Sequence, residues 1–170
     1  MYVDQCQHTF EHLAQTVLPS YMKQLRSELE APKTASLFCS PGRGPVTVAR
    51  ELGLDKDFPG CYVLMDGERP IYVGISRGVL SRLRQHFTGK THFDASLAYA
   101  MAQRRIPTKG QRSIVMEQPV FQQAFSEAQA YLRTLYVAFI EIANPLELHV
   151  FEAYAAMSLG THEWNTFRTH

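Results

Sequence analysis

The sequence has no long hydrophobic run, few cysteines and almost no net charge. No apolar stretch approaches the ~18 residues that a membrane-spanning helix needs, so we expect no membrane association. Residues 1–15 lack the basic start and apolar core of a secretory signal peptide. Cys6, Cys39 and Cys61 are scattered and form no Cys-x-x-Cys spacing, which indicates neither a zinc site nor a disulfide framework. We therefore expect a protein of the reducing cytoplasm.

Two familiar catalytic motifs are also missing, although fragments of them occur. The Gly-Lys-Thr of residues 89–91 lacks the upstream glycine of a phosphate-binding loop, because Arg84 stands at that position. His162-Glu163 lacks the second histidine of a zinc-protease helix, because Thr166 stands where it is needed. The sequence therefore excludes both motifs.

The length of 170 residues fits one domain with an added N-terminal piece. We expect a helical extension over residues 1–55, followed by a domain over residues 57–170 that contains a helical insertion at about 88–135. No internal repeat or low-complexity segment interrupts this organisation.

The clearest local prediction is a β-hairpin. Two apolar, β-prone runs, 61–65 and 71–75, flank a turn that contains Asp66-Gly67. The sequence predicts an α+β fold, with a small three-stranded mixed or antiparallel sheet flanked by helices. The other expected elements are helices at 4–30, with a break near Pro19, and at 47–54, 77–87, 96–105, 120–133 and 146–159, a third strand at 136–142, and loops at 31–45 and 106–113.

Positive charge is concentrated in one segment, although the net charge is only +1. Residues 77–112 contain eight basic side chains and one acidic side chain, Asp94. Such segregation favours a surface that faces a polyanion, and the alternative is an ordinary solvated helix and loop. The eight basic residues are Arg77, Arg82, Arg84, Lys90, Arg104, Arg105, Lys109 and Arg112.

Three further patterns suggest a site, and each has a simpler structural alternative. Arg82 and His86 are four residues apart on one helix, where they can present donors to phosphate oxygens or form a basic rim. Glu152 falls within the apolar stripe of the last helix, where it needs a metal ion, a basic partner or access to water. Tyr62 and Tyr72 share a face of the hairpin if the pairing register is even, and they are otherwise packing residues.

Together these residues resemble the GIY-YIG nuclease family. The resemblance covers about residues 57–170, and its elements occur in the family's order. It departs in having cysteine and valine where the family usually has isoleucine, and in the long 88–135 region. The matching elements are Gly60-Cys61-Tyr62, Tyr72-Val73-Gly74, Arg82 eight residues later, His86, the strand at 136–142, Glu152 and Asn165.

The resemblance implies a DNA endonuclease that hydrolyses phosphodiester bonds with one divalent ion, Mg²⁺ or Mn²⁺. It assigns the metal to Glu152, the scissile phosphate to Arg82, and the attacking water to Tyr62 with support from Tyr72. His86 is implied in proton handling or phosphate contact, and Asn165 in organising the site. Gly60 and Gly74 are implied as structural residues of the site. The expected nucleic-acid-binding residues are Arg77, Arg84, Lys90, Arg104, Arg105, Lys109 and Arg112.

Two alternatives remain open. The chain can be a non-catalytic nucleic-acid-binding module of the same fold, or a nuclease that acts on RNA, because fold alone does not determine function.

Overall fold

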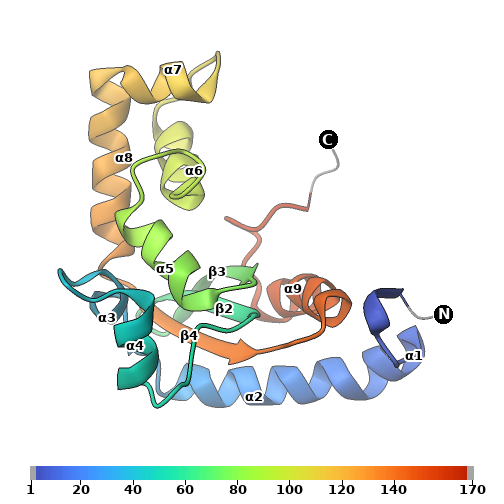
Figure 1. The fold of residues 1–170 in the computed structure, drawn as a ribbon. Helices are drawn as coiled ribbons and strands as arrows, with labels where there is room; N and C mark the ends of the chain where they lie inside the picture. The colour runs from blue at the N-terminus through green and yellow to red at the C-terminus, as the bar shows by residue number, and fades with distance from the viewer. Residues whose placement is uncertain (1–2, 168–170) are drawn as a thin grey trace. The chain divides into compact units, whose positions relative to one another are not determined.

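The computed structural model describes residues 3–167 and contains helices and one β-sheet (Figure 1). The chain divides into two compact units. The first comprises residues 1–33, 58–79 and 136–170, and the second comprises residues 34–57 and 80–135. The predicted N-terminal extension, residues 1–55, is thus shared between the units.

The sheet has four strands in the order β1-β4-β2-β3, not the three that were expected. Strand β2 lies between β3 and β4 and pairs antiparallel with both. The additional strand, β1, has two residues and lies within 31–45. The expectation of a loop over 31–45 was therefore wrong at these two residues. The strands are β1 (Lys33–Thr34), β2 (Gly60–Asp66), β3 (Arg69–Ser76) and β4 (Tyr136–Glu141).

The predicted hairpin is confirmed as the β2–β3 pair. Gly67 adopts a φ of 58° in the turn, a left-handed conformation that glycine reaches without steric cost. The pairing register between β2 and β3 shifts between Leu64 and Met65. The residues of the two strands next to the turn are therefore paired irregularly. Asp66 nevertheless pairs with Arg69 across the turn.

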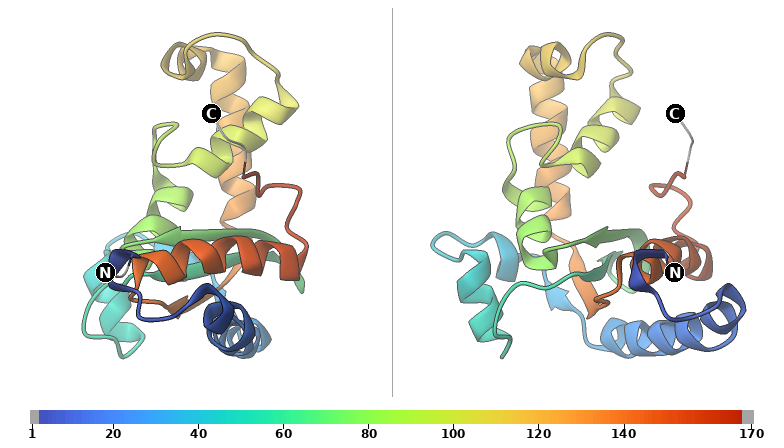
Figure 2. Two further views of the ribbon diagram at one scale, coloured as in Figure 1. Left: turned by 90° about the vertical axis from the view of Figure 1, so that its right-hand side faces the viewer. Right: turned by 45° about the vertical axis from the view of Figure 1, so that its right-hand side comes forward.

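The core of the first unit lies on one face of this sheet. Alternate residues of the strands, including Cys61, Val63 and Val73, pack there against apolar side chains of α2 (Leu18–Glu30) and α9 (Pro145–Leu159). Figures 1 and 2 show α2 running beside β4 and α9 beside β3. The N-terminal helix therefore completes the core of the sheet. Shorter helical turns precede it: η1 (Val3–Gln5), α1 (Phe10–His12) and the π-helical η2 (Leu13–Val17).

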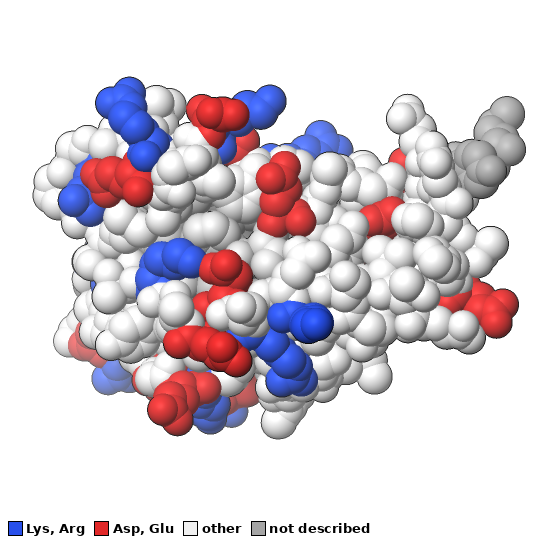
Figure 3. All heavy atoms as spheres, turned by 90° about the horizontal axis from the view of Figure 1, so that it is seen from below, with Lys and Arg blue, Asp and Glu red and all other residues white. Residues whose placement is uncertain are grey.

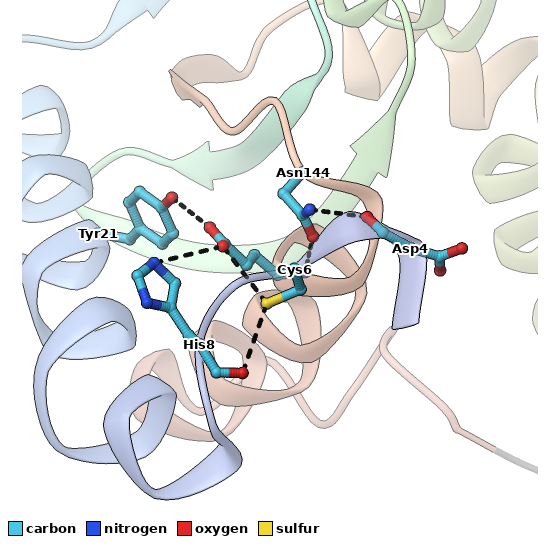
Figure 4. Close-up of polar contacts among 6 residues, drawn as sticks. Asp4, Cys6, His8, Tyr21 and Asn144 are labelled. Atoms are coloured by element: carbon cyan, nitrogen blue, oxygen red, sulfur yellow. Dashed lines mark hydrogen bonds and ion pairs between the residues drawn. The ribbon is translucent and has the colours of Figure 1, made fainter. Parts of the chain in front are cut away.

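A buried carboxylate ties the N-terminal segment to α9 (Figure 4). Glu147 is only 7% exposed, and it accepts hydrogen bonds from the Tyr21 hydroxyl at 2.6 Å and from the Cys6 thiol at 3.6 Å. The Nε2 atom of His8 lies 3.7 Å from the same carboxylate. Burial, reinforced by the hydrogen bond to Glu147 and its charge, raises the pKa of Tyr21. These contacts satisfy a charge that is costly to bury alone.

The ends of α9 follow the expected capping pattern. The Asn144 side chain accepts a hydrogen bond from the Glu147 backbone N–H at 3.1 Å, and it donates to the Asp4 carbonyl at 3.0 Å. Gly160 ends the helix with a φ of 68°, as predicted from its position.

The second unit is helical. Within it, α6 packs against α8, and the short α7 also contacts α8. The expected helix at 96–105 is confirmed. By contrast, α3 lies within the expected loop at 31–45, and α7 begins within the expected loop at 106–113. The Asp57 carboxylate caps the start of α5 by accepting from the backbone N–H groups of Leu80 and Ser81. The helices are α3 (Ser36–Cys39), α4 (Pro45–Glu51), α5 (Val79–Thr88), α6 (Ser96–Arg105), α7 (Arg112–Glu117) and α8 (Pro119–Leu132).

Within residues 3–167, no helix has the length and apolar character needed to cross a membrane.

Candidate functional site

The hairpin places Tyr62 and Tyr72 on one face of the sheet. Tyr62 pairs with Gly74 and Leu64 pairs with Tyr72, so the two tyrosines are diagonal neighbours across the strands. Their ring centroids are 6.3 Å apart. The even register that the sequence analysis required is therefore confirmed. This face is opposite the one that packs on α2 and α9.

Gly74 leaves the space that the Tyr62 ring occupies. A Cβ atom at this position would lie 2.4 Å from both Cζ and Oη of Tyr62. Tyr62 is only 1% exposed, so its ring is held over the glycine by the surrounding residues. Gly60 is restricted by backbone instead, because its Cβ would lie 2.2 Å from the Ile140 carbonyl oxygen. The two predicted structural glycines thus have different and specific reasons to be glycine.

Asn165 binds the outer edge of the strand that carries Tyr72. Its side-chain oxygen accepts from the Val73 backbone N–H at 2.9 Å, and its amide group donates to the Val73 carbonyl at 2.7 Å. Val73 pairs with Val63 on its other side, and β3 is the edge strand of the sheet. The Asn165 amide therefore continues the strand's hydrogen bonding and fixes the backbone between Tyr72 and Gly74.

Glu152 is half-buried on α9, as its place in the apolar stripe predicted. Burial raises the pKa of its carboxyl group, and nearby His149 acts in the opposite direction. Burial also raises the pKa of the Cys61 thiol, with a further contribution from the Glu152 charge. The Cys61 side chain points to the α9 side of the sheet, whereas Tyr62 and Tyr72 lie on the opposite face. No other residue of 3–167 forms a hydrogen bond or an ion pair with Glu152.

The buried Glu147 and the half-buried Glu152, both on α9, therefore differ in the partners of their carboxylates. Glu147 is surrounded by donors from the chain itself, and its charge is satisfied. Glu152 is desolvated without such donors, so a cation supplied from outside would stabilise it. Sequence analysis singled out Glu152 and missed Glu147, because the partners of Glu147 lie 126 and 141 residues away in the chain.

A hollow of about 470 Å³ opens beside this part of α9. Apolar residues of the sheet end and the helix start line most of it, together with the exposed side chains of Arg77 and His149. His149 is also the residue that acts on the Glu152 pKa. The hollow thus combines apolar walls with the positively charged side chain of Arg77.

Arg82 belongs to the second unit, where its guanidinium binds a neighbouring loop. Its Nη1 donates to the Asp94 carbonyl at 2.9 Å, and its Nη2 donates to the Ser96 hydroxyl at 2.7 Å. Weaker contacts from Nη1 reach the Phe93 carbonyl at 3.5 Å and the Gln85 side chain at 3.2 Å. Among the described residues, none accepts from its Nε–H. Arg82 therefore holds this loop through its two Nη atoms, and its Nε–H is available to donate to another partner.

His86 is fully buried on the same helix, with no exposed surface. Burial, and secondarily the positive charge of Arg82, lowers the pKa of its imidazole to about 3. The ring is therefore neutral near pH 7. A neutral imidazole can donate or accept a hydrogen bond, but its low pKa weakens it as a proton carrier.

Several of the predicted nucleic-acid-binding residues already have partners inside the second unit. Arg84 donates to the Arg43 carbonyl at 2.6 Å, Arg105 forms an ion pair with Glu127, and Arg112 lies over the Tyr99 ring at 5.6 Å. The other four are exposed: Arg77 in the first unit, and Lys90, Arg104 and Lys109 in the second.

The charge separation seen in the sequence coincides with the two units. Residues 34–57 and 80–135 carry eleven Lys and Arg against six Asp and Glu, whereas the first unit carries six against ten. Figure 3 shows basic and acidic side chains interspersed on the face that it draws. The excess of positive charge is thus a property of the second unit's composition.

Across residues 3–167, no group of three or more His, Cys, Asp and Glu side chains is arranged to hold a metal ion. A Mg²⁺ site needs fewer protein ligands than that, because Mg²⁺ commonly binds one or two carboxylates and completes its shell with water and phosphate oxygens. Glu152 fits this requirement.

No family model matches the chain, and neither the curated proteins nor the solved structures include a match to it.

Proposed function

We propose that the chain is a metal-dependent DNA endonuclease of the GIY-YIG type, which hydrolyses phosphodiester bonds with a single divalent ion. The observation that carries the proposal is the contrast between two carboxylates of α9, the buried Glu147 and the half-buried Glu152. Glu147 has Tyr21 and Cys6 as donors, whereas Glu152 is desolvated without a donor from the described chain. A carboxylate kept in that state is typical of a functional site.

Glu152 would hold the metal, with water and phosphate oxygens as the remaining ligands. When bound, the ion supplies Lewis-acid stabilisation of the negative charge that develops on the phosphate and the leaving oxygen. Glu152 itself contributes one fixed carboxylate on a regular helix, which holds the ligand in a defined position.

The two tyrosines would act on the attacking water. Tyr62 has a rigidly held ring, because Gly74 beneath it and the surrounding core leave it no other position. It would position the attacking water and, as a phenolate, accept the proton that the water loses, and Tyr72 would support the same water from the neighbouring strand. Asn165 keeps this strand in place through its two hydrogen bonds to Val73.

Arg82 would bind the scissile phosphate through donors that include its Nε–H. In the second unit it also holds the 93–96 loop, so phosphate binding and loop position are coupled through one guanidinium. His86 is neutral near pH 7, so any contact that it makes with the phosphate would be a hydrogen bond from an uncharged ring. The exposed basic side chains would contact the phosphates of the nucleic-acid backbone and not the base edges, so they would not distinguish sequences. These residues are Arg77, Lys90, Arg104 and Lys109.

The test is cleavage of three substrates, supercoiled plasmid, single-stranded DNA and RNA, each with Mg²⁺, with Mn²⁺ and with a chelator. We expect metal-dependent cleavage of DNA. Arg82→Ala should slow it by roughly 10²–10³-fold, the effect of removing one charge-stabilising donor. The control Arg50→Ala removes an exposed arginine of α4 and should cleave at the wild-type rate.

Three outcomes would count against the proposal. Binding of DNA without cleavage under any metal condition would favour a non-catalytic module. Cleavage of RNA alone would change the substrate class. Cleavage that is unaffected by Arg82→Ala would remove this residue from the site.

A further inference from the structure

The loop that Arg82 holds presents an aromatic side chain to solvent. Phe93 is 74% exposed, although isolated exposed apolar residues are common on protein surfaces. What distinguishes Phe93 is how firmly the chain around it is held. A rigid loop that displays an aromatic ring is arranged for contact with another ring.

Hydrogen bonds fix the backbone on both sides of Phe93. Arg82 donates to the carbonyl groups of Phe93 and Asp94, at 3.5 and 2.9 Å. Asp94 and Thr91 bond to each other twice, through Thr91 Oγ1 to the Asp94 carboxylate and through the Asp94 backbone N–H to Thr91 Oγ1. At the start of the loop, the largely buried Gln129 donates to the Gly89 carbonyl at 2.7 Å.

The ring of Phe93 is also the end of an aromatic series that leads into the interior of the second unit. Phe93 and His92 have centroids 4.0 Å apart, and His92 lies 5.9 Å from the buried Tyr99. Tyr99 in turn contacts the buried Phe121 at 5.1 Å. The free protein therefore already holds Phe93 in place. Stacking of a second ring on Phe93 should cost little further conformational entropy.

The surroundings of Phe93 favour an anionic partner. The exposed Lys90 lies in the same loop, Arg82 lies behind it, and the second unit has nearly twice as many basic as acidic residues. The only acidic side chain among residues 77–112, Asp94, is engaged with Thr91. Nucleic acid combines the two properties required, because each base offers a planar face and each phosphate a negative charge.

We propose that the Phe93 loop, residues 89–95, is a stacking platform for an unpaired nucleobase of a bound nucleic acid. Phe93 stacks on the base face while Lys90 contacts an adjacent phosphate. The inference rests on the proposed function only in requiring a nucleic-acid partner, and it does not depend on Glu152 or on cleavage. Since every base has such a face, the contact adds affinity for unpaired strands without sequence preference.

The test measures binding of a labelled twelve-nucleotide thymidine strand by fluorescence anisotropy in chelator, so that cleavage cannot contribute. Loss of one base–aromatic stack costs about 1–3 kcal/mol, so Phe93→Ala should raise Kd roughly 5- to 150-fold. Phe93→Leu keeps apolar bulk without a π face and should lose as much, whereas Phe93→Trp should bind as the wild type does. The matched control is Phe10→Ala, which removes a phenylalanine that is 72% exposed in the first unit and should leave Kd unchanged.

Two further measurements separate stacking from charge. Phe93→Ala should leave the slope of log Kd against log salt unchanged, whereas Lys90→Ala should reduce it by about 0.7, the value for one phosphate contact on a single strand. On an abasic strand of equal length, wild type and Phe93→Ala should bind equally. In Phe93→Trp, the added fluorescence should be quenched on binding, after subtraction of the Trp164 signal measured in the wild type.

The outcomes distinguish this inference from the proposed function. If the wild-type protein binds the strand and Phe93→Ala binds as tightly as Phe10→Ala, the platform is refuted and the nuclease proposal stands. If Phe93→Leu binds as the wild type does, the contact is apolar insertion and not stacking. If the wild-type protein binds no DNA or RNA strand, both proposals fail. If it binds as predicted but never cleaves, the platform stands and the nuclease proposal fails.

Discussion

The close fit between Gly74 and the Tyr62 ring gives the most quantitative prediction. In Gly74→Ala, the new methyl carbon would lie 2.4 Å from two atoms of the ring, well inside ordinary van der Waals contact. The ring cannot rotate away into solvent, because it is only 1% exposed. The strand must shift, or the ring must adopt a poorer rotamer.

Inserting a methyl group into a packed site of this kind costs typically 1–3 kcal/mol. We therefore expect Gly74→Ala to lower the free energy of unfolding by about 2 kcal/mol. Most of this cost should disappear when the ring is absent. In the Tyr62→Ala background, Gly74→Ala should cost less than about 0.5 kcal/mol, and the difference is the coupling energy of the double-mutant cycle.

Urea denaturation of the four proteins of this cycle measures these energies. Gly44→Ala is the control, because a Cβ at Gly44 has no atom within 4 Å; its position at the start of α4 limits the expected cost to under about 1 kcal/mol. Equal costs of Gly74→Ala with and without the Tyr62 ring would refute the explanation of this glycine.

Three further predictions concern residues around the site. The folded-state pKa of His86 is about 3 against an ordinary value of 6.5, so the unfolded chain binds the extra proton first and stability falls as pH drops below 6.5. From pH 7 to pH 5 the wild type should lose about 2 kcal/mol more than His86→Leu in urea denaturation, and equal losses would contradict the burial argument. Asn165→Ala removes two hydrogen bonds to Val73 and should cost about 1–3 kcal/mol, with faster amide exchange at Val73; unchanged exchange there would show that the side chain does not hold the strand. Tyr21→Phe removes a 2.6 Å hydrogen bond to the buried Glu147 carboxylate and should lower the free energy of unfolding by about 1.5–3 kcal/mol. An unchanged free energy of unfolding would mean that water or His8 replaces the hydroxyl.

Local patterns in the sequence predicted the elements that depend on local physics. The hairpin follows from two β-prone runs around Asp66-Gly67, and the end of α9 follows from Gly160. The β1 strand and α7 were missed, since two and six residues are too few to establish a periodicity. The docking of α2 on the sheet was also missed, because an amphipathic helix does not specify which surface covers its apolar face.

The sequence singled out the candidate residues but did not show the environments of their side chains. The sequence placed Tyr62 and Tyr72 on a common face only if the pairing register was even, and the observed register meets this condition. The sequence did not reveal that Arg82 holds the 93–96 loop, because its acceptors there are mainly backbone carbonyls, which every residue possesses. Nor did it reveal the burial of His86, which requires packing from distant segments.

The central claim is that Glu152 holds one divalent ion on which phosphodiester cleavage depends. It is tested most directly by the initial rate of plasmid nicking as a function of Mg²⁺ concentration, for wild type, Glu152→Gln and the control Glu141→Gln, which alters an exposed carboxylate at the end of β4. We predict a first-power dependence on Mg²⁺ that saturates, wild-type rates for Glu141→Gln, and no cleavage above background for Glu152→Gln. Cleavage in chelator, a second-power dependence on Mg²⁺, or a Glu152→Gln protein as active as the wild type would contradict the claim.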